Sequence, residues 1–342
     1  MENIKSKVVL GLLLGVVVIV GLALVADLPK VVSAVEGFEW GWLPLILGLT
    51  SFNYLLRFFK WHYYLRQVDI HNISRSDSLK VFLGGFATTV TPGKIGEAIK
   101  SLWLKNLTGV GVARTLPVVA AERLSDALAC ALLASVGVFA YPSYWPAFLA
   151  ILAVMLGGIV VIQIRPLSLW LLGIAERLPL VSRFAHSLHE FYESSFELLR
   201  LKNLVVAVGL GTLSWAGEGA AFFLVLRGLG IGPTLTLLFQ AIFILAFSVI
   251  VGGASTLPGG LGAAEVSLAG MLVFVVGLSR DLAASAALLI RFCTLWFGVT
   301  LGFIMLALYR RRLFGGQKPE AGGQTSEIGR PVSEEDAVSP RP

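Results

Sequence analysis

Long apolar runs recur along the whole chain and limit what it can fold into. The first is Val8–Ala26, and further runs cover about 40–58, 113–140, 146–164, 204–226, 235–252, 261–278 and 283–309. A helix needs roughly 20 apolar residues to cross a hydrocarbon core about 30 Å thick. Only 14% of the residues are charged, against about a quarter in soluble domains. The sequence predicts an all-α polytopic membrane protein with about eight membrane segments and no soluble catalytic domain.

The motifs of common enzymes and cofactor proteins are missing from the sequence. The two cysteines, Cys130 and Cys293, lie inside apolar runs, and neither an H-E-x-x-H zinc motif nor a phosphate-binding P-loop occurs. We therefore expect no enzyme activity and no catalytic residue. We also expect no cofactor, no metal and no nucleic-acid partner.

Two polar stretches divide the chain. Residues 165–203 are charged, yet Leu188, Tyr192, Phe196 and Leu199 share one helical face. This pattern indicates an amphipathic segment on the cytoplasmic membrane surface, or a helix packed on its own loop. The Gly-, Ser-, Glu- and Pro-rich residues 313–342 predict a disordered cytoplasmic tail. The transmembrane domain is thus expected over residues 1–312.

Lysine and arginine in the short loops predict the orientation. They gather at the N-terminus, after the second span (where Arg57 and Lys60 are counted as loop residues), at 165–203 and at Arg310–Arg312. Cytoplasmic loops carry this excess. We therefore expect both termini on the cytoplasmic side of a prokaryotic plasma membrane.

The segment 79–105 does not fit a plain span. Val81–Val90 is too short to cross, the chain breaks at Thr91-Pro92-Gly93, and it returns as Ile95–Leu104. Non-helical backbone at membrane depth is tolerated only within protein or beside a water-filled cavity. We expect a re-entrant helical hairpin entering from the cytoplasm, with a peripheral pair of amphipathic helices as the alternative.

The same features recur later in the chain. Leu65-Arg66 resembles Leu226-Arg227, and each copy then reaches a Pro-Gly-x-aliphatic-Gly breaker, an acid and an arginine within an apolar helix. Repeat 1 (about 40–140) and repeat 2 (about 204–309) are expected to have opposite orientations, as in many transporters. Residues 235–278 then form either a second hairpin or two full spans. The expected hinge residues are Pro92, Gly93, Gly96, Pro258, Gly259, Gly260 and Gly262.

Ionisable side chains within the spans are costly and mark candidate functional sites. Arg123 and Arg291 could bind a phosphate through their guanidinium forks, and Thr91, Lys94 and Lys100 could contact the same headgroup. The acids that could shape the groove or couple to protons are Glu97, Glu122, Asp126, Glu218 and Glu265. Acids and arginines could instead neutralise each other as purely structural pairs.

The ordered motifs resemble a known family. Arg57-x-x-Lys60-Trp61, Thr91-Pro-Gly-Lys-Ile-Gly-Glu97, Glu122-Arg-x-x-Asp126 and Leu257-Pro-Gly-Gly-Leu-Gly-x-x-Glu265 together resemble the lysylphosphatidylglycerol synthase transmembrane family. The resemblance implies a flippase-like fold with two re-entrant regions. In fused relatives this domain moves aminoacylated phosphatidylglycerol to the outer leaflet, next to an aminoacyl-transferase domain that this sequence lacks. Stand-alone relatives are associated with other lipids.

The resulting expectation is a flippase-like protein that moves an anionic, phosphate-bearing lipid, either a phospholipid or a polyprenyl-linked one. Its partners would be membrane lipids, with a separate lipid-modifying enzyme as a further candidate and the oligomeric state open. Two alternatives remain: an accessory membrane protein that moves nothing, and a membrane-embedded glycosyl or acyl transferase. Neither a donor-nucleotide site nor a large external loop supports the transferase.

Overall fold

A computed structural model of the chain describes residues 28–91, 96–138, 145–178 and 182–314. The apolar run 8–26, the tail beyond 314 and the expected site residues Pro92, Gly93 and Lys94 lie outside these ranges. Every regular element among the described residues is helical, which confirms the all-α class. The α-helices are α2 (Leu28–Glu36), α3 (Leu43–Gln67), α4 (Arg75–Phe86), α5 (Ile99–Thr108), α6 (Val112–Val138), α7 (Trp145–Gln163), α8 (Arg165–Ala175), α10 (Ala185–Leu198), α11 (Leu201–Gly228), α12 (Leu235–Ala254), α13 (Ala263–Met271), α14 (Arg280–Arg291) and α15 (Phe297–Phe314).

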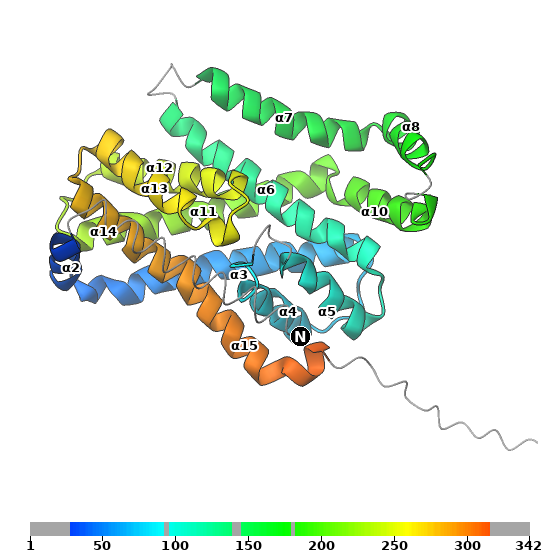
Figure 1. Cartoon of the computed structure of the whole chain (residues 1–342), viewed down its shortest axis with the longest axis horizontal. Helices are drawn as coiled ribbons and strands as arrows, with labels where there is room; N and C mark the ends of the chain where they lie inside the picture. Colours follow the sequence, from blue (N-terminus) through cyan, green and yellow to red (C-terminus); the bar gives the residue numbers. More distant parts are fainter. Residues whose placement is uncertain (1–27, 92–95, 139–144, 179–181, 315–342) are drawn as a thin grey trace, which may run out of the picture.

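The helices form a layered bundle with two distinct ends (Figure 1). At one end, called the α2 end, Lys30 pairs with Asp281 and the N–H of Glu39 donates to the carbonyl of Gly228. At the other, the α10 end, Asn72 donates to the carbonyl of Thr108. Helices α3 and α11 run antiparallel between the ends. Five described segments are long and apolar enough to cross a bilayer: Trp40–Gln67, Leu201–Gly228, Leu235–Ala254, Pro258–Val276 and Arg280–Tyr309.

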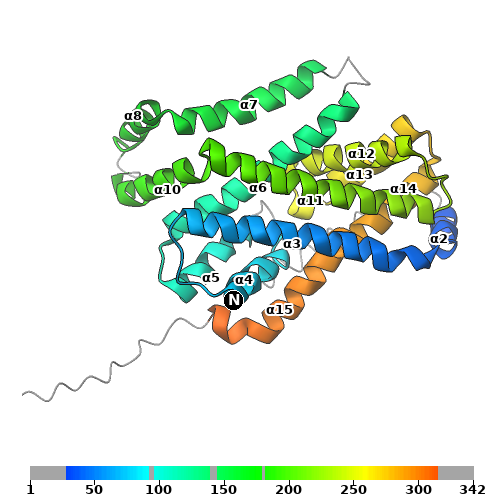
Figure 2. The same ribbon diagram turned by 180° about the vertical axis from the view of Figure 1, so that it is seen from behind.

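Two helical hairpins enter the bundle from opposite ends and meet inside it (Figures 1 and 2). Helices α4 and α5 begin and finish at the α10 end, and α12 and α13 do so at the α2 end. The tips touch, since the N–H of Gly259 donates to the carbonyl of Thr89 at 3.0 Å. Helix α12 is long enough to span on length alone. Its contact with the tip of the short α4–α5 hairpin nevertheless places 255–262 inside the bundle, which favours the hairpin reading of 235–278.

The two repeats are related by an approximate twofold axis that passes between α3 and α11. Leu65 and Leu226 are 161 positions apart, and this same shift relates Asn53 to Ser214. The Asn53 amide donates to the carbonyl of Ser214, while the Ser214 hydroxyl donates to the carbonyl of Asn53, both at 3.1 Å. A reciprocal contact between equivalent residues is what a twofold axis produces. The fold therefore has the inverted-repeat arrangement expected from the motifs.

The placement of Arg57 and Lys60 in a cationic loop was wrong. Helix α3 continues past residue 58 to Gln67, so both side chains lie within a long helix, and both residues are buried. Acidic side chains of α6 form ion pairs with both residues and so stabilise the buried charges. The α10 end therefore has fewer loop cations than the sequence indicated.

The described residues of 165–203 form α8, α10 and the first residues of α11. Helix α8 bends 86° away from the end of α7, and Leu169, Trp170 and Ile174 of α8 are exposed. Helix α10 buries Tyr192 and Leu198 and packs chiefly on α6. Helix α15 continues to Phe314, slightly beyond the expected start of the tail.

We predict that Gly302→Ala lowers stability, because Gly302 lets α15 pack directly on the tip of the first hairpin. An added Cβ would lie 2.3 Å from the backbone nitrogen of Ala87, and such overpacking costs about 1–3 kcal/mol. Thermal unfolding of the purified protein in detergent measures the effect. Gly48→Ala on α3 is the control, since its Cβ meets nothing within 4 Å. Equal melting temperatures for the two variants would contradict this packing.

Candidate functional site

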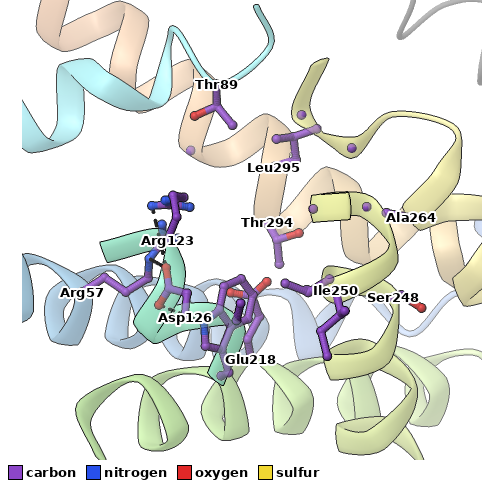
Figure 3. Close-up of a pocket in the computed structure, with 18 of the residues that line it drawn as sticks. Arg57, Thr89, Arg123, Asp126, Glu218, Ser248, Ile250, Ala264, Thr294 and Leu295 are labelled. Atoms are coloured by element: carbon purple, nitrogen blue, oxygen red, sulfur yellow. Dashed lines mark hydrogen bonds and ion pairs between the residues drawn. The ribbon is translucent and has the colours of Figure 1, made fainter. Parts of the chain in front are cut away.

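A cavity of about 530 Å³ lies where the two hairpin tips meet. Its wall includes Gly85 and Thr89 of the first hairpin, Gly252 and Gly259 of the second, and residues of α3, α6, α11 and α14–α15. Figure 3 shows Arg123 and Asp126 on one side of this space and Ile250 and Thr294 on the other. Both repeats therefore enclose one cavity, as substrate sites at repeat interfaces do in many transporters.

Each repeat holds its own hairpin with an arginine–glutamate pair. Arg123 Nε lies 3.1 Å from Glu97 Oε2, and Arg291 Nε lies 2.6 Å from Glu265 Oε1. The two partners are 26 residues apart in both pairs. Arg291 also donates to the carbonyl of Gly259 at 2.6 Å, which fixes the tip of the second hairpin. The arginines that the sequence placed at matching depth are thus matched in their contacts as well.

The first repeat adds a dense charge network behind Arg123. Lys60 Nζ lies 2.5 Å from Asp126 Oδ1, and Lys100 Nζ lies 2.9 Å from Glu122 Oε2. Arg57 reaches Glu122 at 3.4 Å and Asp126 at 3.7 Å. Glu122 also pairs with Arg123 at 2.5 Å. Apart from Arg123, these side chains are almost wholly buried, and buried charges persist only when paired in this way.

The second repeat has neutral residues at the positions equivalent to Lys60, Lys100, Glu122 and Asp126 of this network, and Glu218 at the position equivalent to Arg57. A shift of 168 positions relates Arg123 to Arg291, and it relates Lys100, Glu122 and Asp126 to Leu268, Ile290 and Thr294. The shift of 161 positions relates Lys60 to Ala221. Repeat 1 therefore builds a side of the cavity with many charges, and repeat 2 builds a side with fewer, which are Arg291 and Glu218.

Two aromatic side chains in the cavity wall cross from one repeat to the other. Tyr54 Oη donates to the carbonyl of Thr294 at 2.5 Å, and Trp215 Nε1 donates to Asp126 Oδ1 at 3.2 Å. Tyr54 and Trp215 are equivalent under the shift of 161, as Asp126 and Thr294 are under the shift of 168. The twofold arrangement thus extends to the hydrogen bonds of the wall.

The glycines of the second tip are required by its backbone. Gly259, Gly260 and Gly262 have φ values of 60°, 67° and 85°, a region that other L-residues rarely adopt. The Glu265 carboxylate accepts a 2.7 Å bond from the Gly262 N–H at the start of α13. In the first hairpin Gly96 is needed for close approach, since a Cβ there would lie 2.2 Å from Thr91 Oγ1.

The structure brings most of the expected residues to this cavity. Arg123, Arg291, Lys100, Glu97, Asp126 and Glu218 line it, while Glu122 and Glu265 lie directly behind as their partners. The Thr91 hydroxyl instead donates to the carbonyl of Thr88 and accepts from the N–H of Gly96. Thr89 lines the cavity in its place. Pro258 is buried at the second tip.

Arg57 and Lys60 are the site residues that the sequence reasoning missed. Only the length of α3 distinguishes them from loop cations, and their acidic partners lie 65 and 66 residues away in the chain. Within the described ranges no group of three or more histidine, cysteine, aspartate or glutamate side chains is arranged to hold a metal ion. Among the described residues, each acid near the cavity except Glu218 faces a lysine or an arginine at ion-pair distance.

Comparison with known proteins gives a family and two relatives. The family model described as the lysylphosphatidylglycerol synthase TM region matches residues 9–302. A UPF0104 membrane protein of Methanothermobacter thermautotrophicus is 26% identical over 88% of this chain and 93% of its own length. Another UPF0104 membrane protein, from Pyrococcus horikoshii, is 23% identical over 90% of this chain and 98% of its own. These names describe membrane proteins and state no activity.

We predict that Arg291→Met destabilises the protein, because it leaves the buried Glu265 carboxylate without its cation. Breaking one side of a buried ion pair costs about 3–5 kcal/mol. The free energy of unfolding in detergent, measured for Arg291→Met, Glu265→Gln and the double variant, tests this. The decrease in the free energy of unfolding of the double variant should be smaller than the sum of the two single decreases, because neither charge is then left unpaired. Simple additivity would contradict the pairing.

Proposed function

Since this chain belongs to the lysylphosphatidylglycerol synthase transmembrane family, we propose that it moves an anionic, phosphate-bearing lipid across the membrane. The observation that carries the proposal is the single cavity enclosed by both hairpin tips, with Arg123 and Arg291 in its wall. Polar space inside an apolar bundle suits a headgroup whose tails stay in the bilayer. The lipid is a phospholipid or a polyprenyl-linked molecule, and the protein itself is no enzyme.

The two arginines suit a phosphate because it can replace the carboxylates they now contact. A guanidinium fork binds either oxyanion through two parallel hydrogen bonds. The side chain of Arg123 is 31% exposed and that of Arg291 is 16% exposed, so both are reachable from the cavity. Lys100 is almost fully buried beside Glu122 and would act mainly by holding that acid.

A phosphate that replaces a glutamate as the partner of an arginine would link lipid binding to movement of a hairpin. Glu97 lies just before α5 and Glu265 lies in the first turn of α13, so each arginine pair ties one hairpin to the bundle. A phosphate that takes the arginine releases the carboxylate, which can then accept a proton. Because the hairpins enter from opposite ends, release of one opens the cavity toward one side only. This is the alternating access of inverted-repeat transporters.

The proposed setting is a prokaryotic plasma membrane with both chain termini in the cytoplasm. Lys105, Arg114 and Arg200, which lie at the α10 end or one turn from it, support this orientation through the excess of cations in cytoplasmic loops. The first hairpin then opens toward the cytoplasm and the second toward the outside. Membrane lipids are the proposed partners.

We predict that Arg123→Gln abolishes lipid movement, measured on the folded fraction of the variant, because the change also removes the ion pair with Glu97 and lowers stability. The measurement is translocation in liposomes that contain the purified protein and phosphatidylglycerol, lysyl-phosphatidylglycerol or a polyprenyl phosphate, read with an impermeant reagent. Loss of a charge-assisted phosphate contact should slow the step at least about tenfold. Arg200→Gln is the control, since that side chain is exposed, pairs with the nearby Glu197 and lies over the Phe196 ring, away from the cavity.

If the wild-type protein moves a lipid and Arg123→Gln moves it equally fast, this arginine does not have the role assigned to it. If well-folded wild-type protein moves none of the lipids, the accessory role becomes the better reading. Co-purification of a lipid-modifying enzyme would then be the observation to seek.

A further inference from the structure

An apolar groove of about 800 Å³ runs between α6, α7 and α11, apart from the charged cavity. Its wall includes Leu128 and Leu132 of α6, Leu152 and Leu156 of α7, and Leu204 and Val208 of α11. Small residues keep it open: Ala131 lines it from α6, and Gly209 and Ala216 line it from α11. Figures 1 and 2 both show α7 standing away from α11.

The groove begins where the charged cavity ends. On α6, Leu124 lines the cavity and Leu128, one turn or roughly 6 Å further on, lines the groove. On α7, Ile151 and Met155 line the cavity, while their neighbours Leu152 and Leu156 line the groove. The same two helices therefore wall both spaces, with charge on one side and hydrocarbon on the other.

We propose that this groove holds a hydrocarbon chain of the lipid whose headgroup enters the cavity. The inference rests on the proposed function and specifies where the tail lies. A headgroup cavity that adjoins an apolar groove matches one amphipathic molecule, because hydrocarbon gains by leaving polar surroundings while a phosphate gains by contact with arginine. The volume is in the range of small-molecule sites.

Another segment of this chain is a less suitable occupant. The run Val8–Ala26 leads directly into α2, which packs on α14. In both views α2 and α14 lie at one end of the bundle, whereas α7 lies along its top. The groove opens between α7 and α11, where lipid has direct access.

A matched pair of glycines provides the test. Gly209 lies in the groove wall and Gly157 lies on α7 outside it, and a Cβ at either position meets nothing within 4 Å. Gly209→Leu adds bulk inside the groove, and Gly157→Leu adds the same bulk outside. Val205→Trp, from an exposed residue of the groove wall, repeats the test if Gly209→Leu fails to fold.

Two measurements are made on the wild type and each variant. The first is the amount of lipid phosphate retained per purified protein. The second is translocation in liposomes of phosphatidylglycerol, the probe lipid, with 18-carbon or with six-carbon chains. We expect Gly209→Leu to retain less lipid and to slow the 18-carbon probe about tenfold. The six-carbon probe should be unaffected, and Gly157→Leu should behave as wild type.

If Gly209→Leu retained as much lipid as the wild type and moved the 18-carbon probe as fast, the inference would be overturned while the proposed function stayed intact. The melting temperature of Gly209→Leu is a third measurement, and a decrease from wild type that is equal with and without lipid would also overturn the inference, because a chain segment would then fill the groove. A wild-type protein that neither retains nor moves any lipid would count against the proposed function itself.

Discussion

The pairing of a buried arginine with a glutamate beside a helix break is the interaction on which this fold depends. Arg123 with Glu97 and Arg291 with Glu265 hold two hairpins whose tips meet inside the bundle. In hydrocarbon an unpaired ion is costly and an open backbone equally so. Each pair neutralises the buried ion. In the second hairpin the pair also satisfies part of the open backbone. The Gly259 carbonyl and the Gly262 N–H both bind members of the pair there.

Duplication with inversion explains why these pairs face one cavity. The reciprocal hydrogen bonds of Asn53 and Ser214 mark the axis, and the crossing bonds of Tyr54 and Trp215 continue the relation into the cavity wall. A twofold axis through the bundle brings equivalent residues from opposite ends to the same depth. A protein built in this way has two similar hairpins around one space, an arrangement that fits the proposed transfer of one molecule between two sides.

The symmetry is broken in the chemistry. Repeat 1 carries Lys60, Lys100, Glu122 and Asp126, whereas the equivalent residues of repeat 2 are alanine, leucine, isoleucine and threonine. The repeat 1 side is thus held by many ion pairs, whereas the repeat 2 side has the single pair of Arg291 with Glu265. An amphipathic ligand would meet many fixed charges on one wall and few on the other. The groove beside α7 extends the apolar environment further along α6.

The sequence by itself determined the all-α membrane class, the two breakers, the inverted repeat and the matched arginines. Apolar run length and local Pro-Gly motifs carry that information directly. Only the tertiary structure decided which charge faces which, because Arg57 and Lys60 meet acids 65 and 66 residues away through the packing of α3 on α6. The groove and the contact of Gly259 with Thr89 are likewise set by how whole helices pack. Spacing along the chain does not encode such distances, since they arise when separate helices come together to satisfy buried charges and backbone groups.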